Sequence, residues 1–165
     1  MNIDLFDYVI ERHCLASLIQ YNYAWPELQV YIKDSDFYNS SHRTIFNTIC
    51  RLIESKSETN EVLITGKLKS LGIDQFEDIK MEDYVGSICK IPVSKDAWRD
   101  FYKSLLEYRI KRDIYSTGQE LQKVAQNTQG IEELIRIADE VYSEKTKKII
   151  SINKDEFIDL ADGLG

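Results

Sequence analysis

The chain has 165 residues, of which 43% are hydrophobic and 30% are charged, and this composition is typical of a globular protein and excludes an obviously disordered one. No apolar run approaches the roughly 18 residues that a membrane-spanning helix needs, and the N-terminus lacks the basic and apolar regions of a signal peptide. The 28 acidic and 21 basic residues give a net charge of −7, so the chain is a poor candidate for gripping a nucleic-acid backbone unaided.

The first half of the chain has the apolar spacing of short amphipathic helices. Pro26 suits the first position of a helix, Gly72 suits a helix C-cap, and Pro92 stops the helix before it. We predict helices over residues 7–20, 26–32, 40–55, 60–71 and 81–90, with a loop over 73–80.

The second half predicts two long helices. From Ser94, a good N-cap, to about Gln126 the sequence has no proline and one glycine, which predicts a helix about 48 Å long. After a break at 127–130, a second amphipathic helix over 131–148 completes an αα-hairpin. Its apolar positions are too many for two helices to hide between themselves, so we expect a second chain to cover them. The expected interface residues are Ile110, Ile114, Leu121, Val124, Ile131, Leu134, Ile135, Val141 and Tyr142.

These elements predict an all-α fold in three parts. Residues 1–92 form a globular helical head of about five helices, and the hairpin of residues 93–148 projects from it. Residues 149–165 form an acidic linker: its end, "SINKDEFIDLADGLG", carries four acids against one lysine. We expect at most a short helix around 157–161.

The sequence offers no catalytic motif. It has no G-x-x-x-x-G-K-[ST], His-Glu-x-x-His, Cys-x-x-Cys or G-x-S-x-G pattern. The only histidines are His13 and His42, and the cysteines Cys14, Cys50 and Cys89 are far apart and flanked by apolar residues, as buried free thiols are. We therefore predict no catalytic residue, metal site or cofactor, and we do not expect this chain to be an enzyme.

The stretch "DSDFYNSSHRTIFNTICRLIE" over 34–54 combines a histidine and an arginine with aromatic residues. It is best explained as the start of a helix, with N-cap candidates in "NSS" and an aromatic staple just before them. We expect His42 to hydrogen-bond the backbone of the preceding loop and Arg43 to pair with a carboxylate such as Asp36 or Glu54. The structural signature comprises Phe37, His42, Arg43 and Phe46.

Five motifs follow one another along residues 7–148. They are "ERHCLASLI", "DFYNSSHRTIF", "NEVLITGKLKSLG", "DYVGSICKIPVS" and "FYKSLLEYRIKRDI", and a final helix over 131–148 follows them. In this order and spacing they resemble the N-terminal domain of DnaB-type replicative helicases. Glu11, Leu15, Leu18 and Ile19 match that family's opening helix, and the second motif matches its Asp-Phe-Tyr…His-Arg-x-Ile-Phe signature. Phe101, Glu107 and Arg112 are in register in the fifth motif.

The resemblance implies a domain that does not hydrolyse ATP and works in DNA replication. It implies a collar of paired subunits at one end of a hexameric ring, with homodimers or a ring of dimers formed through the hairpins. Primase and the helicase loader are the implied partners. DNA would be bound only weakly or through an ATP-dependent motor domain, which would follow residue 165. The implied location is the cytoplasm of a bacterium or a phage-infected bacterium.

Some residues depart from the resembled pattern. Ala16 replaces a usual glycine, and Trp98 and the lysines at 145, 147 and 148 are unlike cellular members. These departures suggest a divergent, phage-encoded member of the family.

A helical adaptor is the alternative interpretation. The helicase-binding C-terminal domain of bacterial primases has a similar helical subdomain and a long hairpin, and a standalone or primase-derived domain of this kind would bind a replicative helicase in trans. The Met1 opening argues against a primase C-terminus. A G-x-x-x-x-G-K-[ST] motif encoded within about a hundred residues after Gly165 would decide for the helicase.

Overall fold

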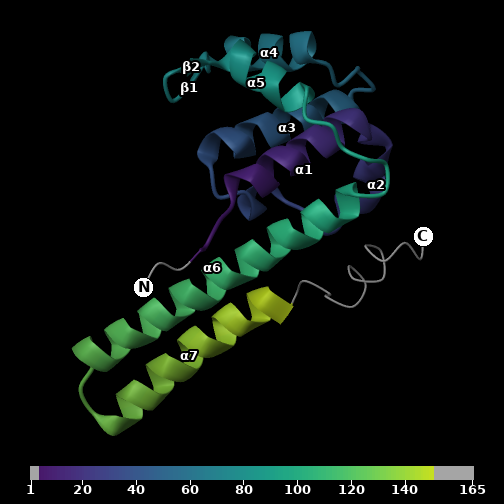
Figure 1. Cartoon of the computed structure of the whole chain (residues 1–165). Helices are drawn as coiled ribbons and strands as arrows, with labels where there is room; N and C mark the ends of the chain where they lie inside the picture. The colour runs from purple at the N-terminus through teal and green to yellow at the C-terminus, as the bar shows by residue number, and fades with distance from the viewer. Residues whose placement is uncertain (1–3, 151–165) are drawn as a thin grey trace. The chain divides into compact units, whose positions relative to one another are not determined.

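The computed structural model describes the backbone of residues 4–150 and the side chains of residues 4–144 (Figure 1). It is almost entirely helical over this range, so the prediction of an all-α fold is confirmed. The elements are α1 (Tyr8–Gln20), η1 (Asn22–Ala24), α2 (Trp25–Leu28), η2 (Asp34–Asp36), α3 (Ser40–Glu54), α4 (Glu61–Ser70), β1 (Gln75–Phe76), β2 (Ile79–Lys80), α5 (Met81–Cys89), α6 (Trp98–Asn127) and α7 (Ile131–Ile150). Within the described residues, no helix is both long enough and apolar enough to cross a membrane.

Helices α1, α3 and α4 begin at polar side chains that accept main-chain N–H groups. The Asp7 carboxylate accepts from Val9 N at 2.8 Å at the start of α1. Asn39 and Asn60 accept from the third residue after them at 3.1 and 2.9 Å, at the starts of α3 and α4. Each of these caps satisfies a donor that the first turn of a helix leaves unpaired, so the sequence fixes where these helices start.

A glycine ends α4 as the sequence predicts. Gly72 has a φ of +76°, a left-handed conformation that favours glycine. Its N–H donates to Lys69 O at 2.9 Å, and Ile73 N donates to Leu68 O at 3.0 Å. This pair of hydrogen bonds is a Schellman ending, and it turns the chain towards the two short strands.

Residues Asp7–Leu106 form one compact unit of the chain. Helix α1 contacts α3 and α5, and α4 also contacts α3 and α5, so the four helices surround a common core (Figure 1). Ala16, which stands where the resembled family has glycine, is completely buried in this core. The largest fully buried side chains are Tyr102, Phe37, Leu15, Leu18, Leu28, Ile32, Ile45, Ile49, Ile64, Leu68, Met81 and Ile88.

The first turns of α6 belong to this unit. Trp98 is 3% exposed and lies edge-on to Tyr102, with ring centroids 6.4 Å apart. The Tyr102 hydroxyl donates to Cys14 O in α1 at 2.8 Å. The large apolar rings therefore anchor the start of α6 on α1.

Three elements differ from their predicted bounds. Helix α2 ends at Leu28, and Ile32 reaches the core at the end of a turn in which its N–H bonds Leu28 O at 2.9 Å. Residues 75–80 form an antiparallel strand pair, because Phe76 is buried and holds the segment on the core. Helix α6 begins at Trp98, since the chain first turns with Ala97 N bonded to Ser94 O at 3.1 Å.

The other unit comprises the described residues before Asp7 and after Leu106. In it, residues 107–127 of α6 and helix α7 run antiparallel (Figure 1). They are joined by residues 128–130, where Gly130 has a φ of +93°. Arg112 donates to Leu5 O at 2.9 Å and ties the N-terminal segment to α6. The short helix expected around 157–161 lies outside the described residues.

Candidate functional site

The hairpin has no buried core of its own. Among the described side chains of residues 107–144, none is buried. Of the predicted interface residues, Ile110, Leu121, Val124, Leu134 and Val141 are half-buried. The other four, Ile114, Ile131, Ile135 and Tyr142, are 57%, 78%, 65% and 59% exposed. Leaving large apolar side chains in water is costly, so the hairpin presents a surface suited to a partner.

The exposed apolar residues of α7 lie on one side of that helix. At about 100° per residue, Ile131, Ile135 and Tyr142 fall within about 40° of one another. The half-buried apolar residues of α7 are centred about 90° away from them, on the side that faces α6. That facing side consists of Leu134, Ile137, Ala138 and Val141.

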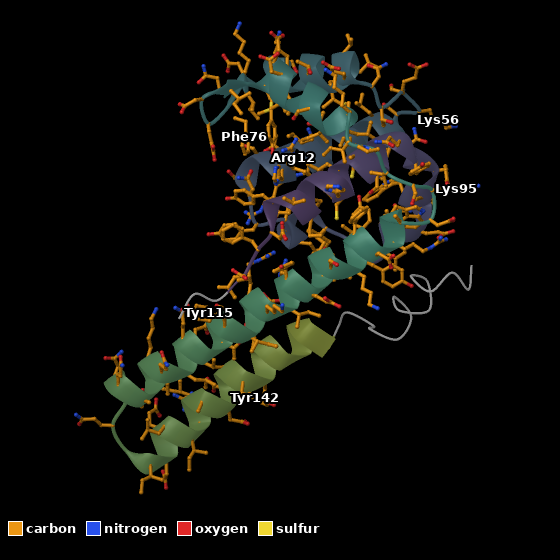
Figure 2. The ribbon with its side chains drawn as sticks, viewed as in Figure 1. Arg12, Lys56, Phe76, Lys95, Tyr115 and Tyr142 are labelled. Atoms are coloured by element: carbon orange, nitrogen blue, oxygen red, sulfur yellow. The ribbon has the colours of Figure 1, made fainter. Side chains whose placement is uncertain are left out.

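The matching flank of α6 lies on the same side of the hairpin. Ile110, Leu121 and Val124 mark the side of α6 that faces α7, and Ile114 and Gly118 lie about 40–80° further round. On each helix these residues are displaced from the side that faces the other helix, in the direction of increasing residue number about the helix axis. Because the two helices are antiparallel, this displacement leads to the same flank of the hairpin on both. We call the exposed residues Ile114, Ile131, Ile135 and Tyr142 the hairpin flank; Figure 2 shows Tyr142 on α7.

Ion pairs occupy the opposite side of α7. Arg136 binds Glu133 and donates to Glu140 Oε1 at 2.9 Å. The hydrogen bond from Arg136 lowers the pKa of the Glu133 carboxyl. Such exposed pairs add little stability, but they leave α7 with one charged side and one apolar flank.

A second cluster is centred on Glu11, which is only 2% exposed. Its carboxylate accepts Tyr38 N at 2.9 Å, Asn39 N at 3.2 Å and His42 Nδ1 at 2.8 Å. A buried carboxylate is stable only when it is hydrogen-bonded in this way. Glu11 thus ties α1 to the loop before α3 and to α3 itself.

His42 continues this cluster to α5. Because an ionised carboxylate can only accept, His42 Nδ1 donates to Glu11, and His42 Nε2 is hydrogen-bonded to the Tyr84 hydroxyl. Burial raises the pKa of Tyr84 to about 12, so its hydroxyl keeps its proton. The His42 ring stacks on Phe76 at 5.7 Å between centroids, and Phe76 stacks on Tyr84 at 3.8 Å. His42 is completely buried, so this Tyr–His–Glu chain has no room for a substrate and acts in structure.

The hydrogen-bond partners expected of His42 and Arg43 are wrong. The His42 ring binds Glu11 and Tyr84, and not the backbone of the preceding loop. Arg43 donates to the carbonyls Phe37 O at 2.7 Å and Tyr38 O at 3.2 Å, and not to a carboxylate. The loop before α3 directs these two carbonyls towards Arg43, while its Tyr38 and Asn39 N–H groups donate to Glu11.

The two phenylalanines of the signature pack together. The Phe37 and Phe46 rings are 4.9 Å apart, and Phe46 also meets Trp25 edge-on at 5.7 Å. The structure therefore brings together Phe37 and Phe46 in the core and His42 in the buried cluster, and leaves Arg43 at the surface holding the loop. All four signature residues belong to the unit Asp7–Leu106, whereas the hairpin flank belongs to the other unit.

Sequence reasoning matched Glu11 to the opening helix of the resembled family but did not predict the cluster that joins it to His42, Tyr84 and Phe76. One signal was available: Glu11 precedes Cys14 and Leu15 by three and four residues and so shares their apolar side of α1. A carboxylate on the apolar side of a helix needs a buried hydrogen-bond donor. His42 is one of only two histidines in the sequence that could be this donor. Among the described side chains, no group of three or more His, Cys, Asp or Glu residues could hold a metal ion.

The chain was compared with known proteins. A family model described as the DnaB-like helicase N terminal domain matches residues 4–107. The crystal structure of the N-terminal domain of DnaB helicase from Mycobacterium tuberculosis matches with a TM-score of 0.72 at 15% sequence identity, over 86% of this chain and 99% of that one. No curated protein matches the sequence significantly.

Proposed function

The chain belongs to the family of DnaB-like helicase N-terminal domains, and from that premise we propose that it assembles the helicase ring and contacts the priming and loading machinery. The domain of this family is non-catalytic, so the chain itself is not an enzyme. Its work is to bring chains together. The ATP-dependent motor would be supplied by a separate domain of the same helicase.

The observation that carries the assembly role is the hairpin flank. It groups four large apolar side chains on one side of two antiparallel helices, each between 57% and 78% exposed. An isolated exposed apolar residue needs no explanation, whereas a contiguous group marks an interaction site. The same flank on a second copy is complementary to it under a two-fold axis. A homodimer through the hairpins, repeated as a ring of dimers, is the assembly that we propose.

The priming partners follow from the family. A collar domain at one end of a hexamer is placed to meet primase and the helicase loader, in the cytoplasm of a bacterium or of a phage-infected bacterium. The match to a helicase domain over residues 4–107 favours this role over that of a primase-derived adaptor. Co-sedimentation of the chain with the helicase-binding domain of a bacterial primase tests it, and the absence of a complex at high micromolar concentration would count against it.

Light scattering across a concentration series tests assembly. We expect the average mass of the wild type to rise from that of a monomer towards that of a dimer or a larger ring of dimers between low and high micromolar concentration. Ile131→Asp with Ile135→Asp should abolish the rise, because each introduces a charge into the contact. Val62→Asp is the control outside the hairpin, since Val62 is as exposed as Ile131, at 78%, but lies in the other unit.

Two results would contradict the assembly role. One is a wild type that stays monomeric throughout the series. The other is self-association that Val62→Asp weakens as much as the paired hairpin substitutions do.

A further inference from the structure

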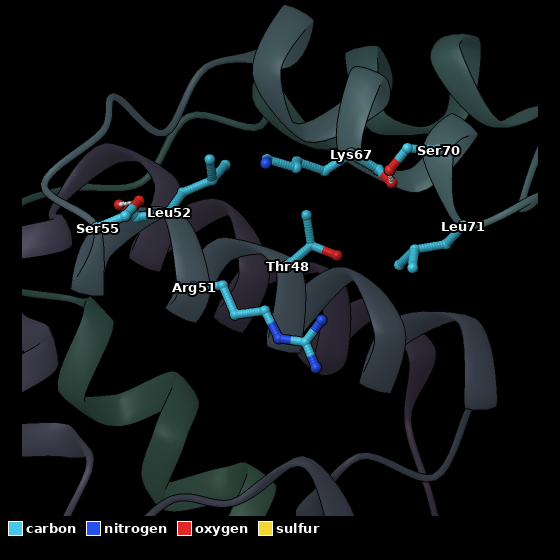
Figure 3. A pocket seen from close by; sticks show the side chains of 7 residues that line it. All are labelled: Thr48, Arg51, Leu52, Ser55, Lys67, Ser70 and Leu71. Atoms are coloured by element: carbon cyan, nitrogen blue, oxygen red, sulfur yellow. Dashed lines mark hydrogen bonds between the residues drawn. The ribbon is translucent and has the colours of Figure 1, made fainter.

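A groove separates the second half of α3 from the end of α4. It has a volume of about 390 Å³, and Figure 3 shows the side chains along its two walls. Both walls lie within the compact unit Asp7–Leu106. The lining residues are Thr48, Arg51, Leu52 and Ser55 on the α3 side and Lys67, Ser70 and Leu71 on the α4 side.

Two cationic side chains of the groove lining are available to bind a ligand. Arg51 on α3 and Lys67 on α4 form no ion pair or side-chain hydrogen bond with the described residues. The hydroxyls of Thr48, Ser55 and Ser70 each donate to a main-chain carbonyl of their own helix, at 2.8, 3.0 and 2.6 Å. In a chain with a net charge of −7, a groove with an unpaired cation on each wall is suited to an acidic ligand.

Carboxylates fit this groove better than a phosphate does. Its walls are the C-terminal parts of α3 and α4, so it offers side-chain cations but no N–H groups of a helix N-terminus. Phosphate sites in proteins use the N–H groups of helix N-termini. Leu52 forms part of the floor and Leu71, 54% exposed, forms part of the rim. A ligand with carboxylates on either side of an apolar strip would satisfy both features.

The sequence of this chain contains such a segment. Residues 155–162, "DEFIDLAD", carry four acids and the apolar residues Phe157, Ile158 and Leu160. At about 100° per residue in a helix, the acids fall on one side and the apolar residues on the other. Glu156 and Asp162 then flank the apolar strip at its two edges, one for each wall of the groove.

We propose that this groove binds the acidic segment 155–162 of a second copy of the chain. Phe157 and Leu160 would contact Leu52 and Leu71, and the flanking carboxylates would pair with Arg51 and Lys67. The inference is independent of the hairpin flank and of the helicase role, because it uses other residues and another chemistry.

A labelled peptide of residues 153–163 tests the proposal by fluorescence anisotropy. The receptor is the full chain in which Asp155, Asp159 and Asp162 are changed to Asn and Glu156 is changed to Gln, so that its own segment does not compete. We expect saturable binding that weakens with salt. Arg51→Glu with Lys67→Glu in that receptor should weaken it roughly three- to thirtyfold, the effect of losing two exposed charge pairs.

Three controls make the test specific. Lys90→Glu with Lys95→Glu makes the same change in charge outside the groove lining and should leave the affinity unchanged. A peptide with Glu156→Lys and Asp162→Lys should bind the Arg51→Glu, Lys67→Glu receptor better than the natural peptide does. Thermal unfolding of each receptor checks that it is folded.

The result that would overturn the proposal is the absence of binding at millimolar peptide. Equal weakening by the Lys90 and Lys95 substitutions would overturn it too, because the peptide would then respond to overall charge. A scrambled peptide of the same composition that binds equally well would show that segment 155–162 is not the specific occupant.

Discussion

Replacing Glu11 with alanine should be among the most damaging single changes in the chain. The substitution removes a carboxylate that is 2% exposed and leaves three donors without their acceptor: the buried His42 Nδ1 and the part-buried Tyr38 N and Asn39 N. It also breaks the link from α1 to the loop before α3.

The magnitude follows from the number and kind of these hydrogen bonds. A hydrogen bond to a charged group contributes about 1.5–3 kcal/mol, and an unsatisfied buried donor costs about 1–3 kcal/mol. Simple addition overestimates the loss, because water and small shifts satisfy part of the cluster. Breaking a buried hydrogen-bond network is among the changes that cost the most, and we expect Glu11→Ala to cost about 3–5 kcal/mol.

Urea unfolding followed by circular dichroism measures the loss. A domain of this size has a free energy of unfolding of about 5–15 kcal/mol, so the midpoint should fall strongly while the slope stays constant. Tyr84→Phe removes one hydroxyl from the far end of the same cluster and should cost less, roughly 1–3 kcal/mol. In the double variant Glu11→Ala, His42→Ala the cost should be smaller than the sum of the single costs, since both residues act in one network.

A Glu11→Ala variant within about 1 kcal/mol of the wild type would refute this reasoning, because one ordinary hydrogen bond contributes that much. Strict additivity in the double variant would show that Glu11 and His42 do not form a common cluster.

Three further predictions concern the unit Asp7–Leu106. Phe46→Ala should lower the free energy of unfolding by about 3–5 kcal/mol in urea titration, because the ring is 2% exposed and lies against Phe37 and Trp25; a loss below about 1 kcal/mol would contradict this packing. Burial raises the pKa of Tyr84 from 10.0 to about 12, so its contribution to stability is present below the lower value and is lost between the two. The urea midpoint of the wild type should therefore fall more steeply above pH 10 than that of Tyr84→Phe, and parallel curves would contradict it. In the native protein a thiol reagent should modify the half-buried Cys89 before Cys50 and Cys14, which are buried; mass spectrometry of the partly modified protein reads the order, and early modification of Cys14 would contradict its burial.

The helices of the chain were predictable because their signals are local. Asn39 and Asn60 cap α3 and α4, and Gly72 ends α4, and each acts within a few residues of its own position. The helical period also gave the apolar positions of the hairpin, but it did not separate the exposed Ile114, Ile131, Ile135 and Tyr142 from the five half-buried ones.

The buried cluster was not predicted because its partners lie far apart in sequence. Glu11 and His42 are 31 residues apart, and His42 and Tyr84 are 42 residues apart. Only the packing of α1, α3 and α5 brings them together. The strand pair at residues 75–80 was missed because its buried residue, Phe76, acts through stacking on Tyr84 and not through a strand period.

Hydrogen–deuterium exchange at low and high protein concentration tests the central claim, that a second copy covers the hairpin flank. We predict slower exchange at high concentration in residues 107–144, because a covered helix opens less often. Ile131→Asp with Ile135→Asp should remove this concentration dependence, and Val62→Asp should leave it. Exchange that is the same at both concentrations, or slowing confined to residues 7–106, would contradict the claim.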